Sequence, residues 1–362
     1  MSIISFIYQI PMILLAVVGV GFLIGFHEFG HFIFCKLFRV STPSFSIGFG
    51  PRLFTKKIGE TTFALSAIPL GGYVEIAGAQ EVGQGDQKEA KRKDQYSFAT
   101  KPYYQKMIII GGGILFNLAF AYTTLVILFM AGIPKTQLLP YSSTPVIEKL
   151  ASNSPGEQAQ LQPGDKVLQI NDIALSDENM KDFVGILAQH ADSTVNLMIQ
   201  RDGETIPFAI QLGNGVSTPL LGASFALKNI PGTSLSQAVQ QSIKTVNHWI
   251  VTTFGAFKAM AKQQTTKGLG GPLAIISETV KSIDDGLSIF FIVLCFISVN
   301  LAVLNFIPLP IFDGGQALFY TIEALVGRSL DTVRIYIHYI SWIMVMVLFL
   351  YLTCKDLIKI CT

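Results

Sequence analysis

Charged residues are scarce in this chain of 362 residues, since Asp, Glu, Lys and Arg together make up 14% of it. Half of the residues are hydrophobic, and the mean hydropathy is +0.50. Soluble domains contain about 25% charged residues, so this composition excludes an ordinary soluble protein and indicates a membrane protein. The formal net charge is only +2, and the basic residues are dispersed, which argues against nucleic acid as a partner.

Cysteine is also rare, and its spacing has no pattern. The four cysteines are Cys35, Cys295, Cys354 and Cys361, with no Cys-x-x-Cys pair among them. Such spacing predicts neither a disulfide framework nor a thiolate zinc cluster. Any metal ligands must therefore be sought among His, Asp and Glu.

Four long apolar stretches approach the ~20 residues that cross a bilayer as a helix. Lys36 and Arg39 follow the first stretch, and Lys101 and Lys106 precede the second. Because basic residues collect on the cytoplasmic side, we expect the first loop to be cytoplasmic and both termini extracytoplasmic. A lysine pair after the last stretch argues weakly for the opposite orientation.

These signals predict a polytopic α-helical membrane protein with four transmembrane helices, a membrane-associated β-hairpin region and one inserted PDZ-like domain. The expected segments are transmembrane helix 1 at 1–35, a cytoplasmic loop with the hairpin at 36–104, helix 2 at 105–133, the extracytoplasmic PDZ-like domain at 141–213, an amphipathic interfacial helix at 234–262, helix 3 at 286–307, a cytoplasmic-side segment at 308–334 and helix 4 at 335–353.

The end of the first apolar stretch contains the motif His27-Glu28-Phe29-Gly30-His31. Helix positions four apart differ by about 40° around the axis, so His27 and His31 can hold one metal ion with Glu28 beside it. Ionisable groups within a membrane helix are costly and seldom lack a partner or a function. His27 lies about 24 Å along the helix from Pro11, which predicts a metal inside the membrane, nearer its cytoplasmic face. The alternative is a pair of interfacial histidines with a snorkelling glutamate.

A catalytic zinc ion takes three protein ligands and keeps one open position. Asp313 is the best third ligand, because Pro308 and Pro310 break the third apolar stretch just before it. A broken helix lets a carboxylate reach sideways into a buried cavity. The alternative is that Asp313 only caps the next helix. The remaining histidines, which we expect to be structural or exposed, are His190, His248 and His338.

Between the first two spans, residues 45–77 alternate in short apolar stretches broken by Gly and Pro, a pattern typical of hairpins. A hairpin this apolar is expected to dip into the membrane edge, where a free strand edge could pair with an extended peptide. The alternative is a cytoplasmic hairpin that only packs on the helices.

Two further segments interrupt the membrane pattern. Residues 141–213 carry a Pro-Gly-Asp turn within Leu161–Asn171, a pattern that resembles a PDZ domain. Residues 234–262 repeat apolar side chains at spacings of three and four, which predicts an amphipathic helix on the outer membrane surface. A plain packing helix is the alternative for this second segment.

Four motifs in this order resemble the site-2 protease family of intramembrane zinc metalloproteases, most closely the bacterial RseP group that acts on anti-sigma factors. They are His27 to His31, Ile68 to Val74, Gly271-Pro272 and Asn305 to Gly315. The resemblance extends over nearly the whole chain and includes the position of the PDZ-like insertion.

This resemblance implies a zinc endopeptidase of the bacterial inner membrane that cleaves single-span membrane proteins, of the anti-sigma factor or remnant signal peptide type, in regulated intramembrane proteolysis. It implies one Zn²⁺ per chain near the cytoplasmic side and an extracytoplasmic PDZ-like domain that gates substrates by size. The implied roles are zinc ligands for His27, His31 and Asp313, catalytic base for Glu28, and substrate positioning for Asn305, Gly71, Gly72, Tyr73 and Val74.

Two other classes of function remain open at this point. A catalytically silent adaptor would bind peptides through the PDZ-like domain, but it would not need Glu28, Asn305 and Asp313 together. A zinc transporter would place ligands on several spans along a polar path, whereas the candidates here cluster at one depth. The partners expected are single-span substrates and the lipid bilayer, and the sequence does not predict an oligomeric state.

Overall fold

The computed structural model describes residues 3–79, 87, 89–139, 143–175, 180, 183–215, 220–263, 270–328 and 330–361. The chain forms two compact units. The first, the membrane unit, comprises residues 1–127 and 239–362, and the second, the inserted unit, comprises residues 128–238.

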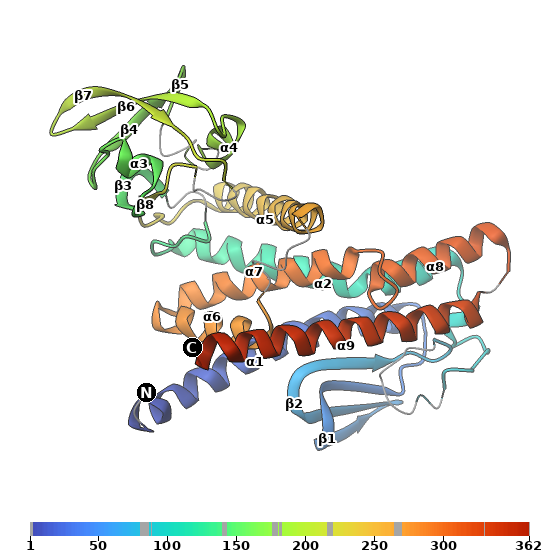
Figure 1. Cartoon of the computed structure of the whole chain (residues 1–362). Coiled ribbons are helices and arrows are strands. Elements are labelled where there is room, and N and C mark those ends of the chain that lie inside the picture. Colours follow the sequence, from blue (N-terminus) through green and yellow to red (C-terminus); the bar gives the residue numbers. More distant parts are fainter. Residues whose placement is uncertain are drawn as a thin grey trace. The chain divides into compact units, whose positions relative to one another are not determined.

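The helices and strands of both units are labelled in Figure 1. In chain order they are α1 (Ile3–Leu37), β1 (Ser44–Ile58), β2 (Thr61–Glu75), the 3₁₀ turn η1 (Phe98–Thr100), α2 (Tyr103–Ala131), β3 (Ser143–Leu150), α3 (Pro155–Gln158), β4 (Lys166–Ile170), β5 (Ile173–Ala174), α4 (Phe183–Gln189), β6 (Thr194–Arg201), β7 (Glu204–Gln211), β8 (Ala223–Leu227), α5 (Leu235–Gln263), α6 (Pro272–Asp284), α7 (Leu287–Phe306), α8 (Asp313–Val326) and α9 (Asp331–Cys361).

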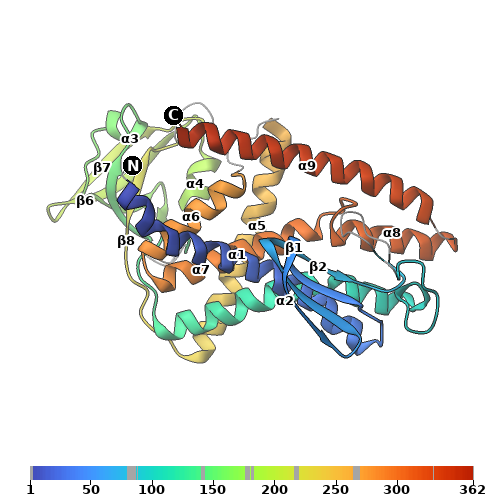
Figure 2. The ribbon, with the colours of Figure 1, turned by 90° about the horizontal axis from the view of Figure 1, so that it is seen from below.

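Four of these helices are long and apolar enough to cross a membrane, within the part of the chain that the structure describes. An apolar segment can span lipid only if its backbone groups are bonded internally, which a helix achieves. The prediction of a polytopic helical protein with four spans is therefore confirmed. The start of α1 and the end of α9 lie at the same end of the membrane unit (Figures 1 and 2). The spans are Ile10–Leu37, Tyr103–Ala131, Leu287–Phe306 and Val333–Ile358.

The short helix α6 contacts α1, α7 and α9 in the membrane unit. Its N-terminus follows Gly271, where the first amides have no partner within the helix. The carboxylate of Asp356, on α9, accepts hydrogen bonds from the amides of Gly271 at 3.3 Å and Ala274 at 3.0 Å. This contact caps α6 with a side chain from the last span.

The hairpin forms as predicted and is folded back on itself. The segment Ser44–Ile47 of β1 pairs with Gly72–Glu75 of β2 in reverse order, and it also pairs with the start of β2, so that Phe45 faces both Phe63 and Val74. Phe45 and Val74 are buried in an apolar cluster with residues from α1 and α2. The segment 72–75 is thereby left as an outer strand of the hairpin sheet.

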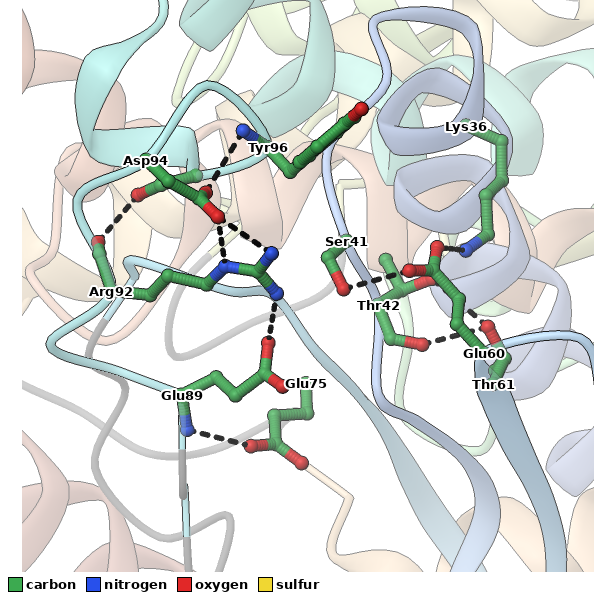
Figure 3. A network of polar contacts seen from close by, with 11 residues as sticks. Lys36, Ser41, Thr42, Glu60, Thr61, Glu75, Glu89, Arg92, Asp94 and Tyr96 are labelled. Carbon is green, nitrogen blue, oxygen red and sulfur yellow. Dashed lines mark hydrogen bonds and ion pairs between the residues drawn. The ribbon is translucent and has the colours of Figure 1, made fainter.

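Polar contacts fasten the hairpin and the following loop (Figure 3). Glu60, at the turn between β1 and β2, accepts hydrogen bonds from Lys36, at the end of α1, and from the hydroxyl of Ser41. Arg92 forms ion pairs with Glu89 and Asp94 within the loop. Residues 80–86 and 88 of the predicted loop lie outside the described residues.

The inserted unit is built on a sheet with strand order β7-β6-β4-β3-β8, and β5 pairs with β4. Its core is made of alternating apolar side chains such as Val195, Leu197 and Ile199, each fully buried. This small β domain agrees with the predicted PDZ-like insert. The strand β8, which pairs with β3, comes after the predicted segment 141–213.

Helix α5 carries the alternating apolar residues expected of an amphipathic helix. Val246 and Trp249 on one side are buried, whereas Val239, Ile243 and Phe254 are each at least 40% exposed. An uncovered apolar stripe is the feature by which a helix binds a membrane surface. Its place on the outer membrane surface remains a prediction.

Candidate metal centre

The two motif histidines project from one face of α1 into the membrane unit. His27 and His31 are 7% and 8% exposed, and their Nε2 atoms lie 3.2 Å apart. The spacing of four residues brings the rings together because each helical turn takes 3.6 residues. Two imidazole nitrogens at this distance form one half of a metal site.

The carboxylate of Asp313 completes the group. Helix α7 ends at Phe306, the chain passes through Pro308 and Pro310, and α8 begins at Asp313. Asp313 Oδ2 lies 3.3 Å from His27 Nε2 and 3.6 Å from His31 Nε2. This oxygen is buried and has no hydrogen-bond partner among the described residues. The break in the third span therefore delivers the carboxylate to the two histidines.

The three ligand atoms fit a zinc ion. Zinc bonds of about 2.0–2.2 Å in a tetrahedral site require ligand atoms about 3.3–3.6 Å apart. The observed separations are 3.2, 3.3 and 3.6 Å. Three ligands with one remaining position is the arrangement of a catalytic site, because the fourth position stays available to water or substrate.

Neighbouring groups orient the two rings. His31 Nδ1 lies 2.9 Å from the carbonyl of Ile109, so it donates there and leaves Nε2 with a lone pair. Near the other ring, Asn117 Nδ2 lies 3.3 Å from His27 Nδ1, and Asn117 Oδ1 has no partner among the described residues. Rotating this amide by 180° would let His27 donate to Oδ1, satisfying the oxygen and freeing Nε2 for a metal.

Glycines allow α1 and α2 to approach closely beneath the site. A Cβ atom on Gly30 would lie 2.3 Å from the carbonyl oxygen of Gly112. A Cβ atom on Gly113 would lie 2.4 Å from the ring of His27 and 2.5 Å from that of His31. Close helix crossings in membranes rely on such small residues. The space that the histidine rings occupy therefore depends on Gly113.

The candidate ligands border a cavity of about 240 Å³. Glu28 and Asn305 also line it, as do Gly72, Val74 and Ile76 of the hairpin. Alternate residues of a strand point to the same side, which explains why Gly72 and Val74 of β2 both face the cavity. The structure thus brings Glu28, Asn305, Gly72 and Val74 to the candidate metal site.

The other two predicted positioning residues do not line this cavity. Gly71 has a positive φ of 142° at the bend of β2. The hydroxyl of Tyr73 accepts a hydrogen bond from Arg52 at 3.0 Å, on the side of the strand that alternates with Gly72 and Val74. These two residues shape the hairpin but do not border the candidate metal site.

The sequence reasoning missed two polar residues near the site. His338, expected to be structural or exposed, is 6% exposed and lines the cavity together with Trp342 of the same helix. Asn117, beside His27, is fully buried, and Ser298 of α7 donates to its carbonyl at 2.9 Å. The available signal was a polar side chain within an otherwise apolar span.

The other two histidines lie elsewhere. His190 belongs to the inserted unit, where its Nδ1 lies 2.9 Å from the carbonyl of Ile186. His248 is exposed on α5. Neither belongs to the metal-ligating group found among the described residues, which consists of His27, His31 and Asp313.

Comparison with known proteins points to the same chemistry. The family model described as Peptidase family M50 matches residues 15–349. The chain is 29% identical to a provisionally named zinc metalloprotease of Campylobacter jejuni, over 96% of this chain and 93% of the relative. It is 26% identical to the zinc metalloprotease RasP of Bacillus licheniformis, over 93% of this chain and 96% of RasP.

Proposed function

The chain belongs to peptidase family M50, and we propose that this intramembrane zinc metalloprotease cleaves the membrane-spanning segment of single-span proteins, such as anti-sigma factors or remnant signal peptides. The observation that carries the proposal is the mutual distance of 3.2–3.6 Å between ligand atoms of His27, His31 and Asp313 in a buried cavity. When bound there, zinc supplies Lewis acidity toward water and toward the scissile carbonyl.

Glu28 is the group that we assign to proton transfer. It follows His27 directly, is half-buried and borders the same cavity. A carboxylate beside the attacking water can take its proton and later deliver it to the leaving amine. This role requires neither a change of position nor a second acid, because the same carboxyl group accepts and then donates the proton.

The hairpin is the part that we assign to substrate binding. A membrane-spanning substrate helix has its amides bonded internally, so it must unwind before hydrolysis, and the freed groups need new partners. The segment 72–75 pairs with β1 on one side, and among the described residues no strand is assigned to its other side. An extended substrate could pair there by β-augmentation, with Asn305 contacting its backbone near the metal.

Two further assignments concern the orientation of the chain in the membrane and the selection of substrates. We assign the metal end of the membrane unit to the cytoplasmic side of a bacterial inner membrane, following the basic residues around the first loop. The inserted unit would then be extracytoplasmic, where it can exclude substrates that still carry bulky outer domains. A tag that is modified only outside the cell, placed after α9, would test this orientation.

A reporter assay with purified protein tests the reaction. The full chain in detergent is incubated with a single-span reporter, the cut is located by mass, and zinc is quantified in each preparation. Glu28→Gln should retain zinc and lower kcat/KM at least 10³-fold. General acid–base catalysis contributes about 10²–10⁴-fold to a reaction rate. Asp313→Ala should lose both zinc and cleavage. The matched control is Glu278→Gln, which makes the same chemical change at an exposed glutamate that forms an ion pair with Lys281.

Two results would contradict the proposal. Normal zinc content and normal cleavage in the Asp313→Ala protein would remove the third ligand. Cleavage by wild-type protein that persists after complete removal of metal by a chelator would remove the metal from the mechanism.

A further inference from the structure

Helix α9 buries only two of the side chains that the structure describes on it, and both are polar. They are His338, which is 6% exposed, and Asp356, which is 8% exposed. The apolar side chains described on this span are all at least partly exposed, as befits a helix that faces lipid. Polar side chains within a span almost always face the interior of the bundle, where they meet a partner or line a cavity.

The burial of Asp356 has a structural explanation, because its carboxylate caps α6. His338 has no comparable role, since its ring forms no hydrogen bond with another described residue. It lines the metal cavity instead. A neutral imidazole has one donor and one acceptor nitrogen, so His338 can offer a hydrogen bond to a molecule that enters this cavity.

Contacts near both ends of α9 fix the rotation that turns His338 toward the cavity. Arg334, one turn earlier, lies 3.8 Å from Glu323 of α8, and Asp356 contacts the start of α6. A helix turns by about 100° per residue, so the following four side chains of α9 project within about 80° of one another: Arg334, His338, Trp342 and Asp356. The stripe held at these two points therefore also directs His338 and Trp342 inward.

His338 is not one of the candidate metal ligands. The ligand atoms of the metal-ligating group lie within 4.8 Å of one another, and His338 is not a member of that group. It borders the same cavity together with two other uncharged polar side chains, Asn305 and Gln316. A hydrogen-bonding group on the wall of a reaction cavity, outside the ligand set, is suited to contact the substrate.

An unwound substrate needs such a group. An extended strand has N–H and C=O groups along both of its edges, and pairing with hairpin segment 72–75 would satisfy one edge only. Away from water, each unpaired backbone group on the other edge is costly. In Figure 2, α9 lies apart from the hairpin, yet both contribute to the cavity wall. His338 can therefore reach a part of the substrate that the hairpin does not pair.

We propose that His338 is a further substrate-positioning residue, which donates a hydrogen bond from its ring to a backbone carbonyl of the unwound substrate next to the scissile bond. This inference rests on the proposed function, since it deepens the account of how the same cavity holds its substrate. It assigns α9 a direct part in substrate binding and leaves the metal ligands as they are.

A binding assay separates this role from hydrolysis. The full chain in detergent carries Glu28→Gln, so that a fluorescent single-span reporter is bound without being cut, and its Kd is measured by titration. In this background His338→Phe keeps a ring but loses the donor, and it should weaken binding about 5- to 10-fold, the effect of one net hydrogen bond. Zinc content, quantified in each preparation, should not change.

Two further variants make the assay specific. His338→Gln retains an N–H donor and should restore binding to within about twofold of the parent. Tyr339→Phe is the matched control, because it removes a polar group from a ring at the next residue, which is 51% exposed. That substitution should leave the Kd unchanged.

A cross-linking measurement keeps His338 in place and so does not depend on the folding of a variant. The reporter carries a photoreactive residue beside its cleavage site and is irradiated while bound to the Glu28→Gln protein. Labelled peptides, located by mass, should include residues 335–342 of α9. The same photoreactive residue at the far end of the reporter span should not label this segment.

Four results would overturn the assignment. They are parental binding by His338→Phe, loss of zinc from that protein, equal weakening by His338→Phe and His338→Gln, and absence of any cross-link to α9. Each can occur while wild-type protein still cleaves the reporter with zinc, in which case the proposed function stands and only the role of His338 fails. Absence of zinc-dependent cleavage by wild-type protein would instead contradict the proposed function, and this inference with it.

Discussion

Two buried carboxylates, one in each unit, have opposite surroundings. In the inserted unit, Asp165 is 1% exposed, and both its oxygens lie 2.7 Å from nitrogens of the Arg201 guanidinium. The amide of Gln162 also donates to it at 2.8 Å. In the membrane unit, Asp313 Oδ2 has no hydrogen-bond partner among the described residues and faces two imidazole nitrogens.

The difference shows what each carboxylate is for. Burial raises the pKa of Asp165, but the hydrogen bonds from Arg201 and Gln162 outweigh that effect and hold its pKa below the ordinary value. Such a pair fixes the local fold. A buried carboxylate without hydrogen bonds is costly, and Asp313 is best understood as one whose partner is a cation. The satisfied carboxylate of Asp165 thus contributes to stability, whereas that of Asp313 is placed to bind a cation.

Among substitutions that leave Glu28 and the three candidate ligands in place, the largest expected effect comes from filling the space beside the two histidine rings. Gly113→Ala would place a Cβ atom 2.4–2.6 Å from ring atoms of His27 and His31, so at least one ring must move. A catalytic group misplaced by about 1 Å can cost 10²-fold. We therefore expect zinc affinity and kcat/KM to fall at least 10²-fold, measured by zinc titration and by reporter cleavage.

The same helix offers a matched control two residues earlier. A Cβ atom on Gly111 would have no heavy atom within 4 Å. Gly111→Ala should therefore keep zinc and activity, and it should stabilise α2 by up to about 1 kcal/mol through helix propensity. Equal zinc affinity in the two variants would mean that Gly113 does not set the position of the rings.

The second expected effect is confined to the inserted unit. Asp165→Asn keeps the shape of the side chain but removes its charge from Arg201, which is 22% exposed and can recover part of its hydration. We expect the opening free energy of this unit to fall by about 2 kcal/mol. Hydrogen exchange of the amides of β4 and β6 in the full chain would measure this change.

If the two carboxylates act independently, Asp165→Asn should leave the candidate metal centre intact. Zinc content of the Asp165→Asn protein should equal that of wild type. Glu148→Gln, which changes an exposed carboxyl of β3, should alter neither exchange nor zinc. A loss of zinc in the Asp165→Asn protein would show that the two carboxylates are not independent.

Much of this arrangement follows from local sequence. The four spans are long apolar segments that must be helical in lipid, and the distance between His27 and His31 follows from helix geometry alone. Asp313 could also be anticipated, because Pro308 and Pro310 must interrupt a helix. The spans and the histidine pair could be predicted because their residues lie near one another in the chain. Asp313 could be predicted because a catalytic zinc ion needs a third protein ligand.

The parts that escaped prediction depend on how distant segments pack. Nothing within α2 says that Gly113 lies against the histidine rings or that Asn117 adjoins His27, because both contacts arise where α2 crosses α1. His338 faces the cavity because of the rotation of α9 about its axis. In a span that is apolar all round, hydrophobic periodicity does not fix that rotation.

The smallest expected effect is at an exposed carboxylate of the membrane unit. Burial raises the pKa of Glu60, but the contacts with Lys36 and Ser41 lower it more, so its pKa stays below 4.5. A depressed pKa means that the contact stabilises the hairpin above about pH 4.5 and loses this effect as the pH falls further. The side chain of Glu60 is 53% exposed, so the contribution should not exceed about 0.5–1 kcal/mol.

Hydrogen exchange at the turn between β1 and β2 can detect this difference. Wild-type protein should lose protection relative to Glu60→Gln as the pH is lowered from about 5 to about 3, and the two should converge at the acid end. Added salt should reduce the difference, because exposed charges are screened. If Glu60→Gln instead removed zinc, an exposed and hydrogen-bonded carboxylate would control the metal centre, and the distinction drawn between Asp165 and Asp313 would fail.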